Sequence, residues 1–219
     1  AARHAFPGLR LGGGMFSCFT ELNRKRPPAG MLDFVTHTTA PIVHAADDRS
    51  VMETLEALPF VTRSVRAFAG AMPYRIGPSA IGMRHNPYGA RLNDNPRGAR
   101  ITMVENDPRQ GEDFAAAWLV GYAAATADAG LEMLALGSLA VPFGVVGAQG
   151  RYPAFEAVKA ISNLSGSAVR AVASSAPSRV LAVAGGETLL VANLTPRMQD
   201  VTVDGASLRL APYGIASHR

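Results

Sequence analysis

Glu21 and Asn23 stand where an apolar segment of this sequence ends, and both side chains suit acid–base or hydrogen-bond chemistry. Residues 15–21 (MFSCFTE) predict a strand, and its two-residue period places Glu21 and Asn23 on one side. A carboxylate there can act as a general base, a nucleophile or an acceptor for sugar hydroxyls. The alternative is a solvated salt bridge from Glu21 to Arg24 or Arg26.

A second group of ionisable residues follows the next predicted strand, residues 32–37 (LDFVTH). His37, His44 and Asp47 lie within a dozen residues of one another, and a histidine can relay a proton near neutral pH. Histidine and aspartate can also hold a metal ion, but this spacing matches no standard zinc motif, so we expect no metal. The alternative for His37 is a buried core residue that bonds a backbone carbonyl.

A third group belongs to the predicted strand at residues 72–83 and the polar loop beyond it. Arg75 can grip a carboxylate or polarise a carbonyl, or it can form a structural bridge to Glu21. The loop at residues 84–100 is longer than a simple connection needs, which is typical of lids and binding loops. The residues expected to contact a substrate across these groups are Asn23, Arg24, His44, Asp47, Arg84, Asn86 and Tyr88.

Strands and helices alternate from Met15 to about Ser165, and this alternation has to position those groups. Four strands are expected at residues 15–21, 32–37, 72–83 and 131–139, with helices at residues 50–70, 107–130 and 152–162. Ser50 and Glu53 predict a capping box at the start of the first of these helices. Four such units predict half of an eight-stranded β/α barrel, whose reactive groups sit at the carboxyl ends of the strands.

The pattern changes after Ser165. Short alternating segments broken by Gly, Pro, Asn and Asp predict an antiparallel sheet or sandwich. We therefore divide the chain into residues 1–165, the second half of a TIM barrel, and residues 166–219, a C-terminal β-domain. Four barrel strands alone leave open sheet edges, so we expect the missing half of the barrel to come from upstream sequence, in the same polypeptide or in another chain.

Composition narrows the class of protein. Hydrophobic residues make up 48% and charged residues 17%, which indicates a folded chain. The net charge is +4, and most of the basic residues are arginines, since Lys25 and Lys159 are the only lysines. The sequence contains no run of basic residues interleaved with aromatics, which is the pattern that would suggest nucleic-acid binding. No apolar stretch reaches the length of a membrane span. The single cysteine, Cys18, predicts a reducing compartment, and we expect a cytoplasmic protein.

Four stretches resemble the D-apionate lactonase family: GGGMFSCFTELNRKRPP, VTHTTAPIVHAADDRSVMETLEAL, YRIGPSAIGMRHNPYG and LLVANLTPRMQDV. The resemblance implies a TIM barrel akin to retaining glycoside hydrolases, followed by a β-domain. It also implies that a sugar lactone, D-apionolactone, is opened to D-apionate. Independently of the resemblance, we expect no cofactor. A lactone is an ester, so the site needs a base for water and a group to stabilise the oxyanion. Glu21 or a histidine is expected as the base, and Arg75, His37 or Asn23 as the oxyanion partner.

Two other functions stay open on the sequence. A glycoside hydrolase of the TIM-barrel type is one, although related glycosidases carry glutamates on the fourth and seventh barrel strands. The expected seventh strand here, YRIGPSAIG, has no glutamate at its end. The other is a carbohydrate-binding relative without catalysis. The lactonase hypothesis requires Glu21, His37 and Arg75 to converge on one cavity at the mouth of the barrel.

Overall fold

Apolar strands alternating with helices fold here into a parallel sheet, as the sequence pattern predicts. The computed structural model describes residues 1–28, 30–89 and 91–218. The sheet has the order β1-β2-β3-β6, and every neighbouring pair is parallel. Its strands are β1 (Gly12–Cys18), β2 (Phe34–Thr38), β3 (Tyr74–Ser79) and β6 (Met133–Leu136). Four adjacent parallel strands in chain order correspond to half of an eight-stranded barrel.

The first strand starts and ends earlier than expected. The strand includes Gly12 and Gly14, and a side chain fits at neither position. A Cβ on Gly12 would lie 1.8 Å from the Phe34 ring, and one on Gly14 would lie 1.9 Å from the Thr36 carbonyl oxygen. Gly14 also has φ +148°, which favours glycine. After Cys18 the chain turns into helix α2 (Phe19–Arg24), so the expectation that residues 15–21 form one strand is wrong.

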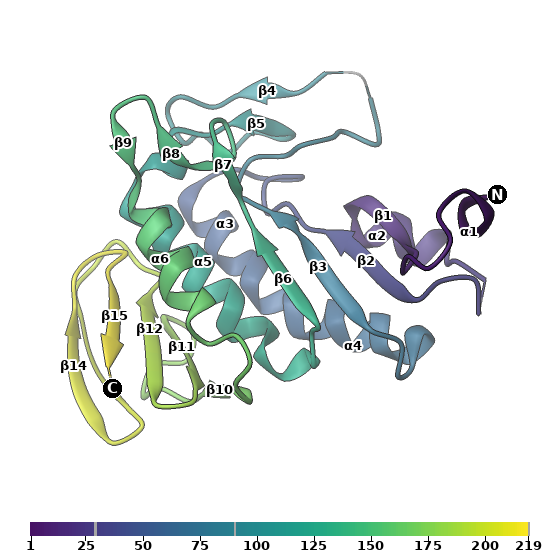
Figure 1. The fold of residues 1–219 in the computed structure, drawn as a ribbon. Coiled ribbons are helices and arrows are strands. Elements are labelled where there is room, and N and C mark those ends of the chain that lie inside the picture. Colours follow the sequence, from purple (N-terminus) through teal and green to yellow (C-terminus); the bar gives the residue numbers. More distant parts are fainter. Residues whose placement is uncertain (29, 90, 219) are drawn as a thin grey trace.

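Helices cover one face of the sheet (Figure 1). They are α3 (Asp48–Glu53), continued by η1 (Thr54–Ala57) and α4 (Leu58–Ala69), then α5 (Asp113–Thr126) after η2 (Pro108–Gly111), then α6 (Pro153–Ser162). The cap of α3 is Asp47, which accepts from the Ser50 N–H at 3.1 Å, so the expected capping box on Ser50 is wrong. Helix α5 is buried around its whole circumference from Phe114 to Ala124, as expected for a helix packed on several sides.

Two small sheets lie beyond the carboxyl ends of the main strands (Figure 1). One pairs β4 (Asn93–Asp94) with β5 (Val104–Asn106), and the other joins β7 (Ser138–Ala140), β8 (Gly144–Gly147) and β9 (Gly150–Arg151). The buried Asn95 bonds Ala99 through both its amide nitrogen and its amide oxygen, which holds the long loop in place. The chain also contains α1 (Ala2–Ala5) and η3 (Ala127–Ala129).

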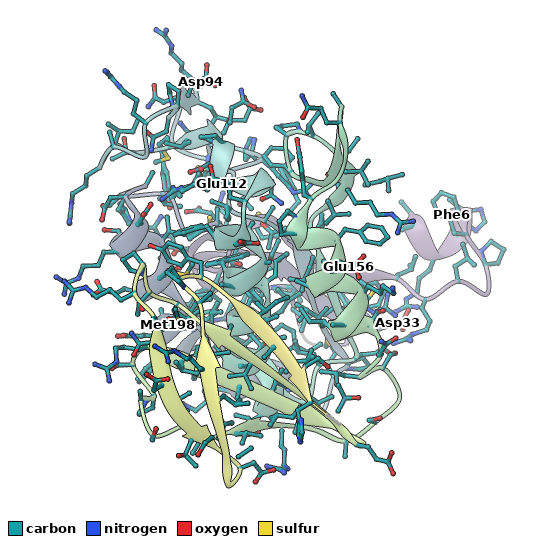
Figure 2. The ribbon with its side chains drawn as sticks, turned by 90° about the vertical axis from the view of Figure 1, so that its left-hand side faces the viewer. Phe6, Asp33, Asp94, Glu112, Glu156 and Met198 are labelled. Carbon is teal, nitrogen blue, oxygen red and sulfur yellow. The ribbon has the colours of Figure 1, made fainter. Side chains whose placement is uncertain are left out.

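The last part of the chain is antiparallel, as predicted. Its four-stranded sheet has the order β10 (Val169–Val172), β11 (Val180–Gly185), β12 (Thr188–Asn193) and β15 (Ile215–His218), and β13 (Gln199–Val203) pairs with β14 (Ala206–Leu210). Leu190, Val183 and Ala192 of this sheet belong to the same core cluster as α5. Figure 2 shows side chains filling the space behind this sheet, with Met198 on the C-terminal part and Glu156 on α6.

The other face of the main sheet is open. On β1 the exposed residues are Gly12, Gly14 and Phe16, whereas Ser17 on the opposite side is buried. Phe16 is 69% exposed and Met133 on β6 is 45% exposed. We call this uncovered side of β1, β2, β3 and β6 the open face. None of the helices in the described part of the chain is both long and apolar enough to cross a lipid bilayer.

Candidate functional site

A cavity of about 470 Å³ lies on the open face, toward the carboxyl ends of the strands. Its walls include Phe16 of β1, Thr36 and Thr38 of β2, Pro78 of β3, and Arg84 and His85 of the following loop. This is the end of a β/α barrel at which enzymes of that fold place their active sites. We call it the mouth cavity.

Arg84 is the charged residue of the mouth cavity. Its guanidinium carbon lies 4.7 Å from the centre of the Phe143 ring, which supports one face of the group. Its Nε and Nη2 atoms are buried and have no hydrogen-bond partner within the described chain. Burial lowers the pKa of Arg84 from its ordinary value. Unpaired buried N–H groups are costly, so this side chain is suited to receive an acceptor from a bound molecule.

His85 is exposed and adjoins Arg84 in the same cavity. Its ring lies 5.0 Å from the ring of Phe16, which comes from β1. His85 is not among the site residues predicted from the sequence. A lone histidine in a polar loop carries no local signal, and the only hint available was its place directly after Arg84.

Three residues predicted from the sequence meet beyond the carboxyl end of β1: Glu21, Arg24 and Tyr88. Helix α2 turns Glu21 toward Arg24, with Nη1 to Oε1 at 3.0 Å, and the Tyr88 hydroxyl donates to the same Oε1 at 2.9 Å. The hydrogen bond to Glu21 raises the pKa of Tyr88. The salt bridge that the sequence left as an alternative therefore exists, while Oε2 of Glu21 is not used in either contact. Asn23 lies one residue past Leu22 on the exposed side of α2 and accepts from Arg26.

His37 does not face the mouth cavity. It is fully buried, its Nδ1 lies 2.9 Å from the Thr38 carbonyl oxygen, and its Nε2 lies 2.7 Å from the Tyr74 hydroxyl. A carbonyl only accepts, so Nδ1 carries the proton and Nε2 accepts from Tyr74. Burial lowers the pKa of His37 to about 4. The expectation that His37 converges with Glu21 is wrong, and the buried alternative describes it.

Arg75 does not line the mouth cavity, although its register partner Thr36 does. It is the second residue of β3, where it pairs with Thr36 and Met133. Its Nε donates to Glu132, and its guanidinium carbon lies 3.7 Å from the centre of the Phe34 ring. The expected convergence of Arg75 with Glu21 is therefore wrong, because Glu132 and Phe34 hold its guanidinium at the amino ends of β6 and β2.

The remaining predicted residues stabilise local structure or line a different cavity. Asn86 bonds the Tyr88 N–H and the Arg91 carbonyl oxygen and so shapes a turn, and Asp47 caps α3. His44 lines a second cavity of about 520 Å³ with Thr39, Trp118 and Tyr122. Across residues 1–28, 30–89 and 91–218, no group of three or more His, Cys, Asp or Glu side chains is placed to hold a metal ion.

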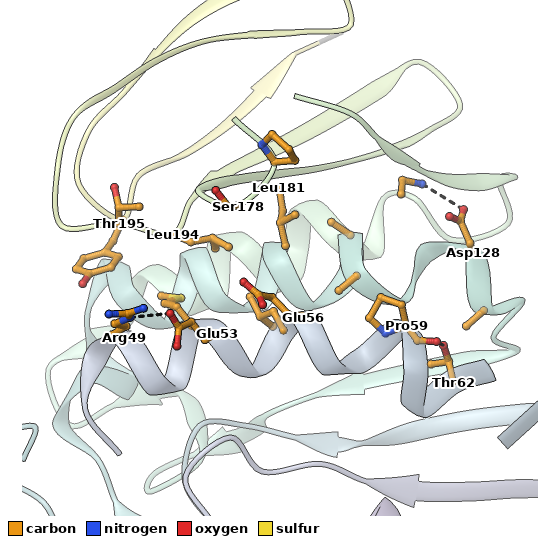
Figure 3. Close-up of a pocket in the computed structure, with 18 of the residues that line it drawn as sticks. Arg49, Glu53, Glu56, Pro59, Thr62, Asp128, Ser178, Leu181, Leu194 and Thr195 are labelled. Carbon is orange, nitrogen blue, oxygen red and sulfur yellow. Dashed lines mark hydrogen bonds and ion pairs between the residues drawn. The ribbon is translucent and has the colours of Figure 1, made fainter. Parts of the chain in front are cut away.

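A third cavity, of about 1000 Å³, lies between α3, η1 and α4 on one side and the C-terminal sheet on the other (Figure 3). Leu181, Leu194 and Pro59 are among the apolar residues of its wall, and Arg49 is paired with Glu53 at 2.6 Å. The helices separate this cavity from the open face of the sheet (Figure 1). Charged side chains line it as well, among them Glu56, Arg63 and Asp128, but it does not lie on the open face, where a β/α barrel places its active site.

Parallel strands covered by helices, a following antiparallel β-domain and polar groups at the carboxyl ends of the strands define a β/α-barrel protein with an appended β-domain. Residues 1–166 match the family described as D-apionate lactonase, TIM barrel domain, and residues 177–218 match D-apionate lactonase, C-terminal immunoglobulin-like domain. The chain belongs to the D-apionate lactonase family. This confirms the family and the fold class predicted from the sequence.

A D-apionate lactonase from Brucella anthropi is 50% identical to this chain over 223 residues. The match covers 98% of this chain and 37% of the Brucella protein, so the chain spans a little over a third of the length of this relative.

Proposed function

We propose that the full-length protein hydrolyses D-apionolactone to D-apionate in carbohydrate catabolism, as a carboxylic ester hydrolase. The observation that carries this proposal is the 50% identity to a D-apionate lactonase over nearly all of this chain. The mouth cavity supports it, since its walls combine a guanidinium, an imidazole and an aromatic ring at the end of the barrel where such enzymes act. On the sequence grounds given above, we place the reaction in the cytoplasm, without a metal or other cofactor.

The reaction needs few groups. A base removes a proton from water, the water oxygen attacks the lactone carbonyl, negative charge develops on the carbonyl oxygen, and the ring oxygen leaves with a proton. We propose His85 or Glu21 as the base. His85 lines the mouth cavity, and Glu21 lies at the same edge with Oε1 fixed by Arg24 and Tyr88. Asn23 and Arg24 remain proposed substrate contacts.

We further propose that additional β/α units complete the barrel over the open face, in the same polypeptide or in another chain. Phe16 and Met133 support this, because both project from strands on the side that faces inward in a closed barrel. The division at residues 165 and 166 is part of the same proposal, with the β-domain packing against α5.

Turnover of two substrate classes by the full-length protein tests the proposal. We expect acid release from D-apionolactone, followed with a pH indicator, and no release of phenol from aryl glycosides. Cleavage of aryl glycosides without lactone opening would favour the glycoside hydrolase instead. Binding of the sugar with turnover of neither substrate would favour a non-catalytic carbohydrate-binding relative. Treatment with a chelator should leave the lactonase rate unchanged.

A further inference from the structure

We propose that Nε and Nη2 of Arg84, named here the Arg84 fork, form a carboxylate-binding site that takes the open-chain sugar acid in the mouth cavity. This deepens the proposed function, on which it rests, because lactone opening converts a neutral ester into a carboxylate. The ligand class is a small hydroxy acid, recognised by its anionic end.

The geometry of the Arg84 fork matches that ligand. Nε and Nη2 are the two nitrogens whose N–H bonds run side by side along one edge of a guanidinium, and this edge pairs with both oxygens of a carboxylate. Both atoms are buried and lack a hydrogen-bond partner within the described chain. A ligand that supplies two acceptors would remove the cost of leaving them unpaired.

The backbone that carries the Arg84 fork is firmly held. The Met83 N–H bonds the Val104 carbonyl oxygen at 2.8 Å, which ties the loop to β5. A Cβ on Gly82 would lie 2.3 Å from the Glu105 carbonyl oxygen, so the two segments pack without space for a side chain. With Phe143 under its guanidinium, Arg84 is preorganised, and binding costs little further ordering.

Neighbouring groups suit the remainder of a sugar acid. Phe16 offers an apolar ring face for C–H groups, and its ring lies 5.0 Å from that of His85. Gly13, Gly14, Gly77 and Thr36 also line the mouth cavity, and their lack of large side chains leaves room for the ligand. In contrast, the Thr38 hydroxyl already donates to the Ser17 carbonyl oxygen at 2.7 Å.

On this proposal, the same fork binds the carbonyl oxygen of the lactone before ring opening. As water adds, the carbonyl oxygen gains negative charge, and a guanidinium at that oxygen stabilises the charged state more than the neutral ester. The product carboxylate retains that charge, so the site should bind the product more tightly than the substrate.

Binding of D-apionate and of glycerate to the full-length protein, measured by calorimetry, tests the inference. Glycerol serves as the uncharged control ligand. We expect both acids to bind and glycerol not to bind detectably. Arg84→Gln should weaken acid binding on the order of 10- to 100-fold, the range of a charge-assisted bidentate pair. Arg91→Gln removes the same charge from an exposed residue of the same loop and should change binding less than about twofold.

Arg84→Lys keeps the charge and most of the volume but loses the fork, and it should bind the acids at an intermediate level. Thermal melting checks that each variant folds. Equal acid binding by wild type, Arg84→Gln and Arg84→Lys would overturn the inference, as would absence of acid binding by the wild type. Lactone turnover without acid binding would reject this inference and keep the proposed function; acid binding without lactone turnover would do the reverse.

Discussion

Arg84, beyond the carboxyl end of the parallel sheet, differs from the arginines at the amino end in its pairing with carboxylates. At the amino end, Arg75 and Arg10 share Glu132, and Arg3 pairs with Asp33. At the carboxyl end, the Arg84 fork has no protein partner in the part of the chain that the structure describes. In β/α barrels the amino end serves stability and the carboxyl end serves function. The lack of a partner therefore distinguishes Arg84 from the paired arginines at both ends, such as Arg75 and Arg109, and supports the proposed ligand site.

The difference also explains why Arg75 and Arg84 have opposite roles although both belong to β3 or its following loop. Arg75 is the second residue of β3, and Arg84 comes five residues after its end. One is neutralised by a carboxylate and stacked on Phe34, and the other is left with unpaired N–H groups beside a cavity. Position along a barrel strand thus carries more functional information than residue type does.

Loss of the base is expected to have the largest effect. In the full-length protein, His85→Asn or Glu21→Gln should lower kcat for the lactone by about 10²- to 10⁴-fold, depending on which residue removes the proton from water. Steady-state lactone hydrolysis measures this. Substitution of the other residue, the one that is not the base, should lower kcat less than about tenfold, because that residue contacts the substrate without transferring a proton.

Matched controls for these variants come from residues remote from the mouth cavity. His4→Asn alters an exposed histidine of α1, and Glu53→Gln alters an exposed carboxylate on α3 that pairs with Arg49. Neither should change kcat. Unchanged kcat in both His85→Asn and Glu21→Gln would remove the base from this end of the sheet.

Arg109 provides a contrast at the carboxyl end, because it is buried and fully paired. It bonds both oxygens of Asp107, Oδ1 of Asp48 at 2.7 Å and the Ala46 carbonyl oxygen. Tyr213, which precedes β15, donates to the other oxygen of Asp48. Arg109→Met should cost about 3–5 kcal/mol in the free energy of unfolding, since the Asp107 charge is left buried without its cationic partner.

A second substitution separates loss of a charge partner from loss of packing. In Arg109→Met with Asp107→Asn, the buried charge is gone and the amide oxygen can still accept from the N–H of residue 109. Urea unfolding of the full-length protein should show that the double variant is more stable than Arg109→Met alone. A double variant no more stable than the single one would assign the loss to packing.

His37 predicts a pH-dependent stability. Its pKa is about 4 in the folded protein and near 6.5 in an unfolded chain, so the unfolded state binds more protons between these values. Stability is therefore complete above pH 6.5 and falls as the pH decreases toward 4. His37 should account for about 2 kcal/mol of the loss between pH 7 and pH 5.

His37→Gln isolates that contribution, because glutamine does not titrate and retains an acceptor for Tyr74. Urea unfolding at pH 7 and at pH 5 should show a smaller pH dependence in the variant than in the wild type. The other titrating groups are common to both proteins and cancel. The same slope in both proteins would contradict the buried neutral state of His37.

The elements with local signals were predictable from the sequence. Helix α6 begins and ends within a residue of its expected bounds, because Pro153 favours the first helical turn. The antiparallel C-terminal part was recognisable from short alternating segments. The start of strand β1 was predicted wrongly because Gly12 and Gly14 leave space for Phe34 and Thr36, which lie some twenty positions away in the sequence. Local patterns do not contain that information.

The site was predictable in part. Glu21, Arg24 and Tyr88 do meet, and Arg84 does line the mouth cavity. His85 was missed because its neighbour Phe16 is distant in sequence. Arg75 was misplaced although the signal was present, since a residue near the start of a parallel strand lies at the amino end. The hydrogen-bond and salt-bridge partners of these side chains, in contrast, could be identified only from the folded structure.

The smallest effect is expected at the amino end of the sheet. Arg75→Gln removes an ion pair whose two side chains are 22% and 35% exposed, and Arg10 continues to pair with Glu132. The expected loss is about 1 kcal/mol or less in the free energy of unfolding, because water screens partly exposed pairs. Lactone kcat and KM should stay at wild-type values in the full-length protein. A large fall in kcat with unchanged stability would mean that an arginine paired within the protein still serves catalysis, and would return Arg75 to the reaction.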